Sequence, residues 1–203
     1  MTITNGYCTL TDFKHWMTAS GQTLEADVGD DAVIETIIEA SSRFIDGECS
    51  RYFYKNTDGA RYYTAIDATC VRTDDLVSVT ALNTDDGTRA YSTAWTEDDF
   101  DLWPYNAALD GRPYVQIIIS PYTHYHFPAN TAKGVKVTGV FGWPSIPAQI
   151  QEACIMIGLS TYKRRYGENL SSVATISAGG VVITPQDVPA TAWAKINPFR
   201  RRI

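Results

Sequence analysis

Hydrophobic side chains recur at spacings of three and four between residues 30 and 49, which is the period of an amphipathic helix. The polar positions fall on the opposite face, and Asp30 or Asp31 stands where a helix-capping residue belongs. The face directed to a core consists of Val33, Ile34, Ile37, Ile38, Ser41, Phe44 and Ile45. The pattern predicts a helix over 30–49, and capping threonines before a glycine at 21 predict a shorter one over 9–20.

The stretch 147–166 is apolar around most of its circumference. Two stripes at helical spacing run along it, one with Ile150, Ala153, Cys154, Ile157 and Thr161, the other with Ile155, Leu159, Tyr162 and Tyr166. A helix with two apolar stripes needs two partners. The helix 30–49 is expected to be one, and the second is expected to be either the sheet or a neighbouring subunit. Ile155, Leu159 and Tyr162 are therefore predicted to pack in the core or between subunits.

Between residues 60 and 142 the hydrophobic period changes to two. Short runs rich in β-branched and aromatic residues alternate with turn-like segments such as "NTDDG" and "FPANTAKG". The sequence therefore predicts an α+β fold. Helices at the two ends form a bundle around an inserted antiparallel β-rich region, and together they make a core over 1–167. Residues 168–203 are expected to be an extended arm with a short terminal helix and a basic tail.

Composition narrows the possible functions. The 203 residues carry a formal net charge of −6, which argues against a generally basic nucleic-acid binder. The four cysteines have no metal-ligand spacing, so they are interpreted as free thiols in a reducing compartment. The N-terminal sequence lacks the features of a signal peptide, and no run approaches a membrane span.

Candidate chemistry is sparse. His124 and His126 lie two apart and could share a metal if they stand on one strand, but no third ligand is evident. Acidic residues cluster at three turns without the pattern of a calcium loop. We expect Asp85, Asp86, Glu97, Asp98 and Asp99 to face either a channel or a tail protein, or simply to cap turns. No nucleophile elbow, zinc motif or phosphate loop is present, so no enzyme and no cofactor is predicted.

The order of these elements resembles a known family. A helix that ends in "CSRYF", a strand insertion, and "GWPSIP" leading into a helix that ends in "KRR" are similar to tailed-phage head–tail connector proteins. The resemblance covers about residues 7–167. It implies a structural virion protein, made in the bacterial cytoplasm, that docks under the portal as a ring, commonly of twelve subunits. It implies a DNA channel through the ring, a tail or stopper protein beneath it, and no catalysis.

The end of the chain is the predicted portal anchor. Trp193 and Phe199 offer apolar side chains, and three arginines, Arg200, Arg201 and Arg202, follow them. Two other functions stay open from the sequence alone. One is a metal-dependent hydrolase that uses His124 and His126, and the other is a nucleic-acid-binding protein associated with DNA packaging.

Overall fold

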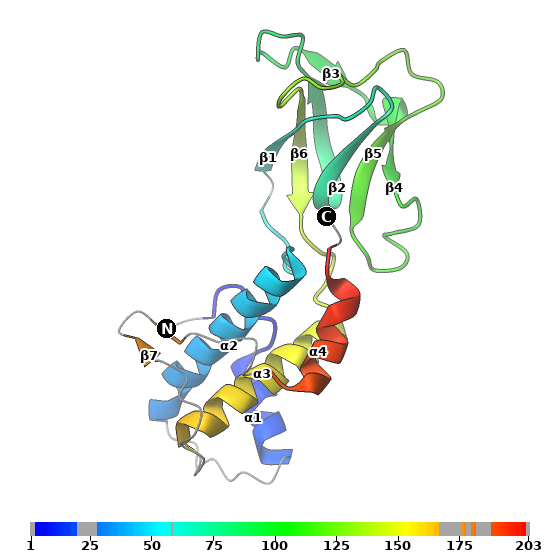
Figure 1. Cartoon of the computed structure of the whole chain (residues 1–203). Helices are drawn as coiled ribbons and strands as arrows, with labels where there is room; N and C mark the ends of the chain where they lie inside the picture. Colours follow the sequence, from blue (N-terminus) through cyan, green and yellow to red (C-terminus); the bar gives the residue numbers. More distant parts are fainter. Residues whose placement is uncertain are drawn as a thin grey trace. The chain divides into compact units, whose positions relative to one another are not determined.

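The computed structural model describes residues 3–19, 28–57, 59–166, 176–177, 180–181 and 188–201. The chain divides into two compact units. The helical unit comprises Met1–Arg51 and Ile146–Ile203, and the strand unit comprises Tyr52–Ser145. The chain thus leaves the helical unit after its second helix and returns to it before its third (Figure 1). The predicted α+β class, with an antiparallel sheet inserted between helices, is confirmed.

Four α-helices build the described part of the helical unit. They are α1 (Leu10–Ala19), α2 (Val28–Cys49), α3 (Ala148–Tyr166) and α4 (Ala190–Ile196), followed by the 3₁₀ turn η3 (Asn197–Phe199). The first three helices lie within two residues of their predicted bounds. Helix α3 packs against each of the other three, and α4 makes its main contact with α3 (Figure 1). The terminal helix therefore belongs to the same unit as the bundle, although the sequence placed it in a separate arm.

The contact between α1 and α3 depends on a glycine. Gly158 is buried on α3, and a Cβ atom placed there would lie 2.6 Å from Cε2 of Phe13 on α1. Phe13 is itself fully buried. The absence of a side chain at 158 thus sets how closely the two helices approach.

An N-terminal strap, defined here as residues 3–9, lies along α2. Its backbone amides at Thr4 and Asn5 both donate to Oε1 of Glu39, at 2.6 and 3.1 Å. The Tyr7 amide donates to Oγ of Ser42 at 3.0 Å, and its hydroxyl donates to Asp46. Burial raises the pKa of Asp46 to about 6, although hydrogen bonds and a nearby arginine oppose that rise. The strap thus provides hydrogen-bond donors to polar side chains of α2 that would otherwise lack these partners.

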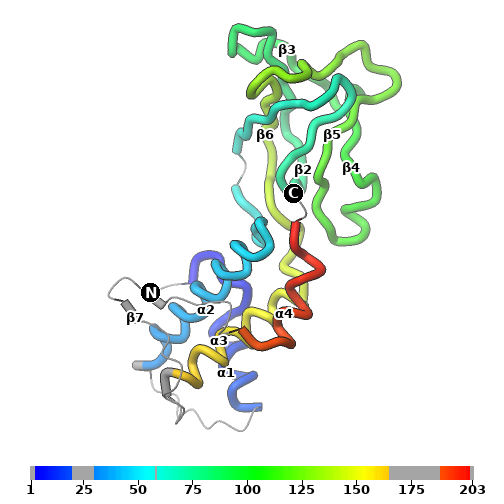
Figure 2. The backbone as a smooth tube through the Cα atoms, viewed as in Figure 1, coloured from blue at the N-terminus to red at the C-terminus, as the bar shows by residue number. Residues whose placement is uncertain are grey.

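The strand unit is one antiparallel sheet in the order β1-β6-β2-β5-β4, and β3 pairs with the far end of β2. Its strands are β1 (Gly59–Tyr63), β2 (Cys70–Thr84), β3 (Thr93–Trp95), β4 (Phe100–Trp103), β5 (Tyr114–Ile119) and β6 (Val135–Phe141). The long central β2 forms hydrogen-bonded ladders with three of the others, β3, β5 and β6, and so connects most of the sheet (Figure 2). One face holds a core of ten buried residues, including Trp95, Phe127 and Phe141.

Two further short strands, β7 (Ile176–Ser177) and β8 (Gly180–Val181), pair with each other. Within the described ranges, no helix has the length and apolar character needed to cross a membrane.

Gly158→Ala should lower the free energy of unfolding by about 1–3 kcal/mol, because the added methyl group collides with the buried Phe13 ring. Urea denaturation followed by circular dichroism measures the change. The matched control is Gly47→Ala on α2, where a Cβ meets nothing within 4 Å. That substitution should be neutral or stabilise by up to about 1 kcal/mol, since alanine favours the helix. Equal effects at the two positions would contradict the proposed packing role.

Candidate interaction surfaces

Two carboxylates of the turn after β2 accept hydrogen bonds within that turn. Asp85 accepts a hydrogen bond from the Arg89 amide at 2.6 Å, and Asp86 accepts from both the amide and the hydroxyl of Thr88. Asp85 is also largely buried. The hydrogen bonds from Thr88 lower the pKa of Asp86. These two residues therefore shape the turn between β2 and β3, as turn chemistry alone predicts.

Asp99 ties two loops of the strand unit together. It ends the 3₁₀ turn η1 (Glu97–Asp99), where its carboxylate accepts from the amide and the hydroxyl of Thr96 at 2.8 and 2.6 Å. It also accepts from the Thr123 hydroxyl at 2.7 Å, in the loop that follows β5. Hydrogen bonds from the Thr96 and Thr123 side chains lower the pKa of Asp99. Its neighbours Glu97 and Asp98 are exposed and are the members of this turn able to face a partner.

The two histidines lie on the outside of the same loop. Both His124 and His126 are exposed, while Phe127 is buried and Tyr125 is 40% exposed. Tyr125 and Phe127 contact the Trp95 ring at centroid distances of 5.3 and 4.7 Å. Among the residues that the structure describes, no three His, Cys, Asp or Glu side chains gather closely enough to hold a metal. The histidines therefore flank an aromatic stack and have no third ligand there.

The predicted portal anchor has partners within its own chain. The Trp193 ring packs edge-to-face on Phe44 of α2 at 5.8 Å, and the Arg200 guanidinium lies 5.1 Å from the centre of the Trp193 ring. Arg200 also pairs with Glu48. The backbone amide of Arg201 donates to the carbonyl of Cys49 at 3.0 Å. The end of the chain is thus fastened to the C-terminal end of α2.

The outer parts of this segment stay accessible. Arg200 is exposed, while Phe199 and Arg201 are half-buried at its end. Arg202 lies outside the described residues. The first basic cluster, Lys163 to Arg165, closes α3, with Lys163 exposed.

The second stripe of α3 is covered mainly by the chain itself. Ile155 and Tyr162 are 2% and 4% exposed, and the Tyr162 hydroxyl donates to Asp30 at 3.2 Å. Leu159 is half-buried. Two of the three residues thus pack in the core of the helical unit without a neighbouring subunit.

Sequence reasoning missed an apolar knob, defined here as the β4–β5 connection over residues 103–112. Trp103, Tyr105 and Leu109 are 41%, 58% and 86% exposed, and the first two rings pack edge-to-face at 5.0 Å. Five backbone hydrogen bonds fold the connection into compact turns around the buried Ala107. The signal was the run "LWPYNAAL", which carries no charge although it connects two strands. An ordered loop that exposes three large apolar side chains is typical of a protein-binding surface.

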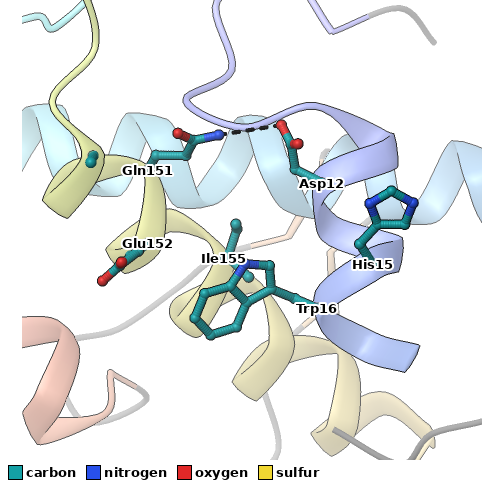
Figure 3. A pocket seen from close by; sticks show the side chains of 7 residues that line it. Asp12, His15, Trp16, Gln151, Glu152 and Ile155 are labelled. Atoms are coloured by element: carbon teal, nitrogen blue, oxygen red, sulfur yellow. Dashed lines mark hydrogen bonds between the residues drawn. The ribbon is translucent and has the colours of Figure 1, made fainter. Parts of the chain in front are cut away.

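A pocket between α1 and α3 was also missed. It has a volume of about 290 Å³ and lies beside Trp16, which is 40% exposed (Figure 3). Gln151 donates to Asp12 across it at 3.3 Å. Hydrogen bonds from Thr9 lower the pKa of Asp12, so this rim of the pocket carries negative charge. Ile155 forms part of its apolar wall.

Comparison with known proteins identifies structures that share this fold. The whole chain aligns with 94% of a chain in the neck of an empty gene transfer agent particle computed with C6 symmetry, with a TM-score of 0.57 and 15% identity. A chain of the neck of the native particle, computed with C12 symmetry, aligns with a TM-score of 0.56 and 16% identity, also over the whole of this chain. A chain of the native gene transfer agent virion aligns with a TM-score of 0.53 and 16% identity. No protein-family profile and no curated protein matches the sequence.

Asp99→Asn should lower the melting temperature at pH 7, because the amide replaces a carboxylate that accepts three hydrogen bonds. The lowered pKa of Asp99 determines how the stabilisation from its carboxylate depends on pH. Its stabilisation is present above the ordinary value of 3.8 and is lost as the pH falls through the lower pKa of the folded state. The difference in melting temperature between wild type and variant should therefore shrink below pH 3.8. Asp98→Asn, on the exposed neighbour, should change little at any pH, and equal losses for both variants would contradict this role.

Proposed function

We propose that the protein is a structural component of a phage-like particle, located where the head meets the tail. The observation that carries this proposal is a likeness along the whole chain, in both units, to chains of particle necks. A fold match limited to the helices would be weak support, because helical bundles serve many functions. Here the helical bundle and its sheet insertion match together, in agreement with the resemblance carried by the sequence.

We further propose that the protein is the head–tail adaptor and forms a ring under the portal. A neck computed with C12 symmetry supports twelve copies as the ring number. A ring requires a head-to-tail interface that closes on itself, so each copy must offer two different surfaces. The half-buried Leu159 and the pocket beside Trp16 are candidate parts of that interface, because both are apolar surfaces that the described chain leaves partly uncovered.

The proposed role is non-catalytic and involves no cofactor. DNA passes through the ring without specific binding, and the overall acidity supports this, since a basic channel would hold the phosphate backbone. The strand unit is the more acidic part, with 7 Lys and Arg against 11 Asp and Glu. The exposed acids Glu97 and Asp98 belong to it and face either the channel or a tail protein in this proposal.

The end of the helical unit is the proposed portal contact. Trp193 packs within the chain and positions the segment. In this proposal the portal contacts the segment through the exposed Arg200 and through its neighbours Phe199, Arg201 and Arg202. Arginine pairs with carboxylates through charge-assisted hydrogen bonds, which gain strength where water is excluded.

The apolar knob of the strand unit is the proposed contact for the tail or stopper protein. Aromatic and aliphatic side chains on an ordered loop lose little conformational entropy when they bind. The flanking acids Asp101 and Asp110 are exposed and favour a groove with a basic rim.

One assembly measurement tests the adaptor role as a whole. The mass of the purified protein should be determined alone and with its portal, by native mass spectrometry or light scattering. A complex with twelve copies per portal ring is expected. A protein that never joins the portal, at concentrations well above those in an infected cell, would overturn the proposal.

Deleting the terminal segment would remove the fully buried Ala192 and Ile196 and expose the surface of α3 against which α4 packs, so point variants test the portal contact better. Arg201→Glu combined with Arg202→Glu should weaken binding to portal-bearing, DNA-filled heads by about tenfold or more, because each charge pair becomes a repulsion. Co-sedimentation with heads measures the affinity. The control is Arg72→Glu combined with Arg112→Glu, which makes the same charge change at exposed positions of the strand unit. Unchanged binding by the first variant would show that this segment is not the portal anchor.

Tyr105→Ser combined with Leu109→Ser should leave binding to heads intact and reduce joining of tails by about tenfold or more, because interface anchors of this type dominate binding. The measurement is the yield of tailed particles when variant-loaded heads are mixed with purified tails. Ile66→Ser combined with Tyr122→Ser is the matched control, since those side chains are 68% and 90% exposed in other loops of the strand unit. Normal tail joining by the knob variant would remove the knob from the interface.

A further inference from the structure

Two cysteines far apart in the sequence meet in the core of the helical unit. Cys8 lies at the end of the N-terminal strap and Cys154 lies on α3, and their sulfur atoms are 3.8 Å apart. They are 4% and 0% exposed. Both are free thiols, and neither has a part in the proposed contacts with portal or tail.

The surroundings of the pair direct the Cys8 thiol toward Cys154. The Ser42 hydroxyl lies 3.4 Å from Sγ of Cys154, but its proton is donated to the Ile38 carbonyl at 2.8 Å. Ser42 also accepts the Tyr7 amide. The Cys8 S–H, which donates to Cys154, therefore favours the thiolate of Cys154 and lowers its pKa, while the same bond and burial raise the pKa of Cys8.

The local backbone can close the remaining gap between the sulfur atoms. A disulfide needs them at about 2.05 Å, so the two atoms must approach by a little under ~2 Å. Cys154 is fixed in the middle of α3, but Cys8 precedes α1 in a non-helical bend. Hydrogen bonds to α2 and the buried Tyr7 ring hold the strap, so Cys8 becomes accessible only when the strap opens locally, a movement that does not require α3 to unfold.

We propose that Cys8 and Cys154 form a site of oxidative cross-linking, whose oxidant is a small-molecule disulfide such as oxidised glutathione. When the strap opens, Cys8 attacks the small disulfide, forms a mixed disulfide and releases one thiol. Cys154 then attacks Sγ of Cys8 and expels the second thiol. Two protein thiols are oxidised, one disulfide is reduced to two thiols, and the two protons pass to the leaving thiolates. The product fastens the strap covalently to α3.

This site has a use if the protein is part of a particle, and that use rests on the function proposed above. The particle assembles in a reducing cytoplasm, where both cysteines stay as thiols, and is then released into oxidising surroundings. A cross-link formed after release would stabilise the neck only once assembly is complete. The chemistry itself does not depend on the particle, so its test can fail or succeed separately from the adaptor role.

The test uses the full chain carrying Cys70→Ser, which removes the thiol that is most accessible among the four. The folded protein is incubated with oxidised glutathione, and its intact mass and peptide map are measured without reduction. We expect a loss of two hydrogens and a peptide that links Cys8 to Cys154. The oxidised form should melt roughly 5 °C or more above the reduced form, and a thiol reductant should reverse the shift.

In the folded protein, burial limits the access of glutathione to the two thiols. Refolding the same protein from urea in a glutathione redox buffer removes this limit. The cross-link between Cys8 and Cys154 should then form in preference to any link with Cys49. Cys8→Ser should lose both the cross-link and the rise in melting temperature, and Cys49→Ser should keep both. If refolded protein keeps Cys8 and Cys154 as thiols, or links either of them mainly to Cys49, the proposal is overturned.

Discussion

Helix α3 must be covered on several sides, and this requirement organises the helical unit. Ile150 and Ile157 lie on one stripe of the helix and Ile155 lies on the other, yet each is at most 2% exposed. Burial of one such side chain contributes about 1.5–3 kcal/mol relative to exposure, so one neighbouring helix would leave much of this stabilisation unused. The chain supplies α1, α2 and α4 as neighbours. Because α1 and α2 come from before the strand insertion and α4 from the end, both termini are needed to complete one core.

The strand unit has a different organisation. Its core lies on one face of an antiparallel sheet and includes the stacked rings of Trp95 and Phe127. A sheet covered on one face can vary its loops without disturbing its ladder of hydrogen bonds. The loops accordingly carry the exposed acids, the histidines and the apolar knob. The helical unit is organised around its buried core, while the strand unit exposes most of the side chains that a partner could bind.

The sequence predicted the helices well because their apolar residues repeat at one clear period, and α3 even showed that it needed more than one partner. It did not reveal which partners. Trp193 looked like an outward anchor because its neighbour in space, Phe44, lies about 150 positions earlier in the chain. The meeting of Cys8 with Cys154 depends on the same long-range folding. The knob was missed for another reason, since "LWPYNAAL" contains both strand-forming and turn-forming residues, and only the folded loop shows which side chains face outward.

The docked terminal segment changes how the proposed portal contact would work. A free arm that folded on binding would lose conformational entropy at that step, and this loss would weaken the contact. Residues 188–201 are instead ordered by Phe44, Glu48 and the buried side chains of α4. The entropy has already been lost during folding, so a partner meets a prearranged group of Phe199 and arginine side chains. Binding there also stabilises the folded helical unit, because α4 cannot leave α3 while its end is held. In the proposed ring, each subunit would contribute one such contact, and the strength of the joint would grow with the number of subunits engaged.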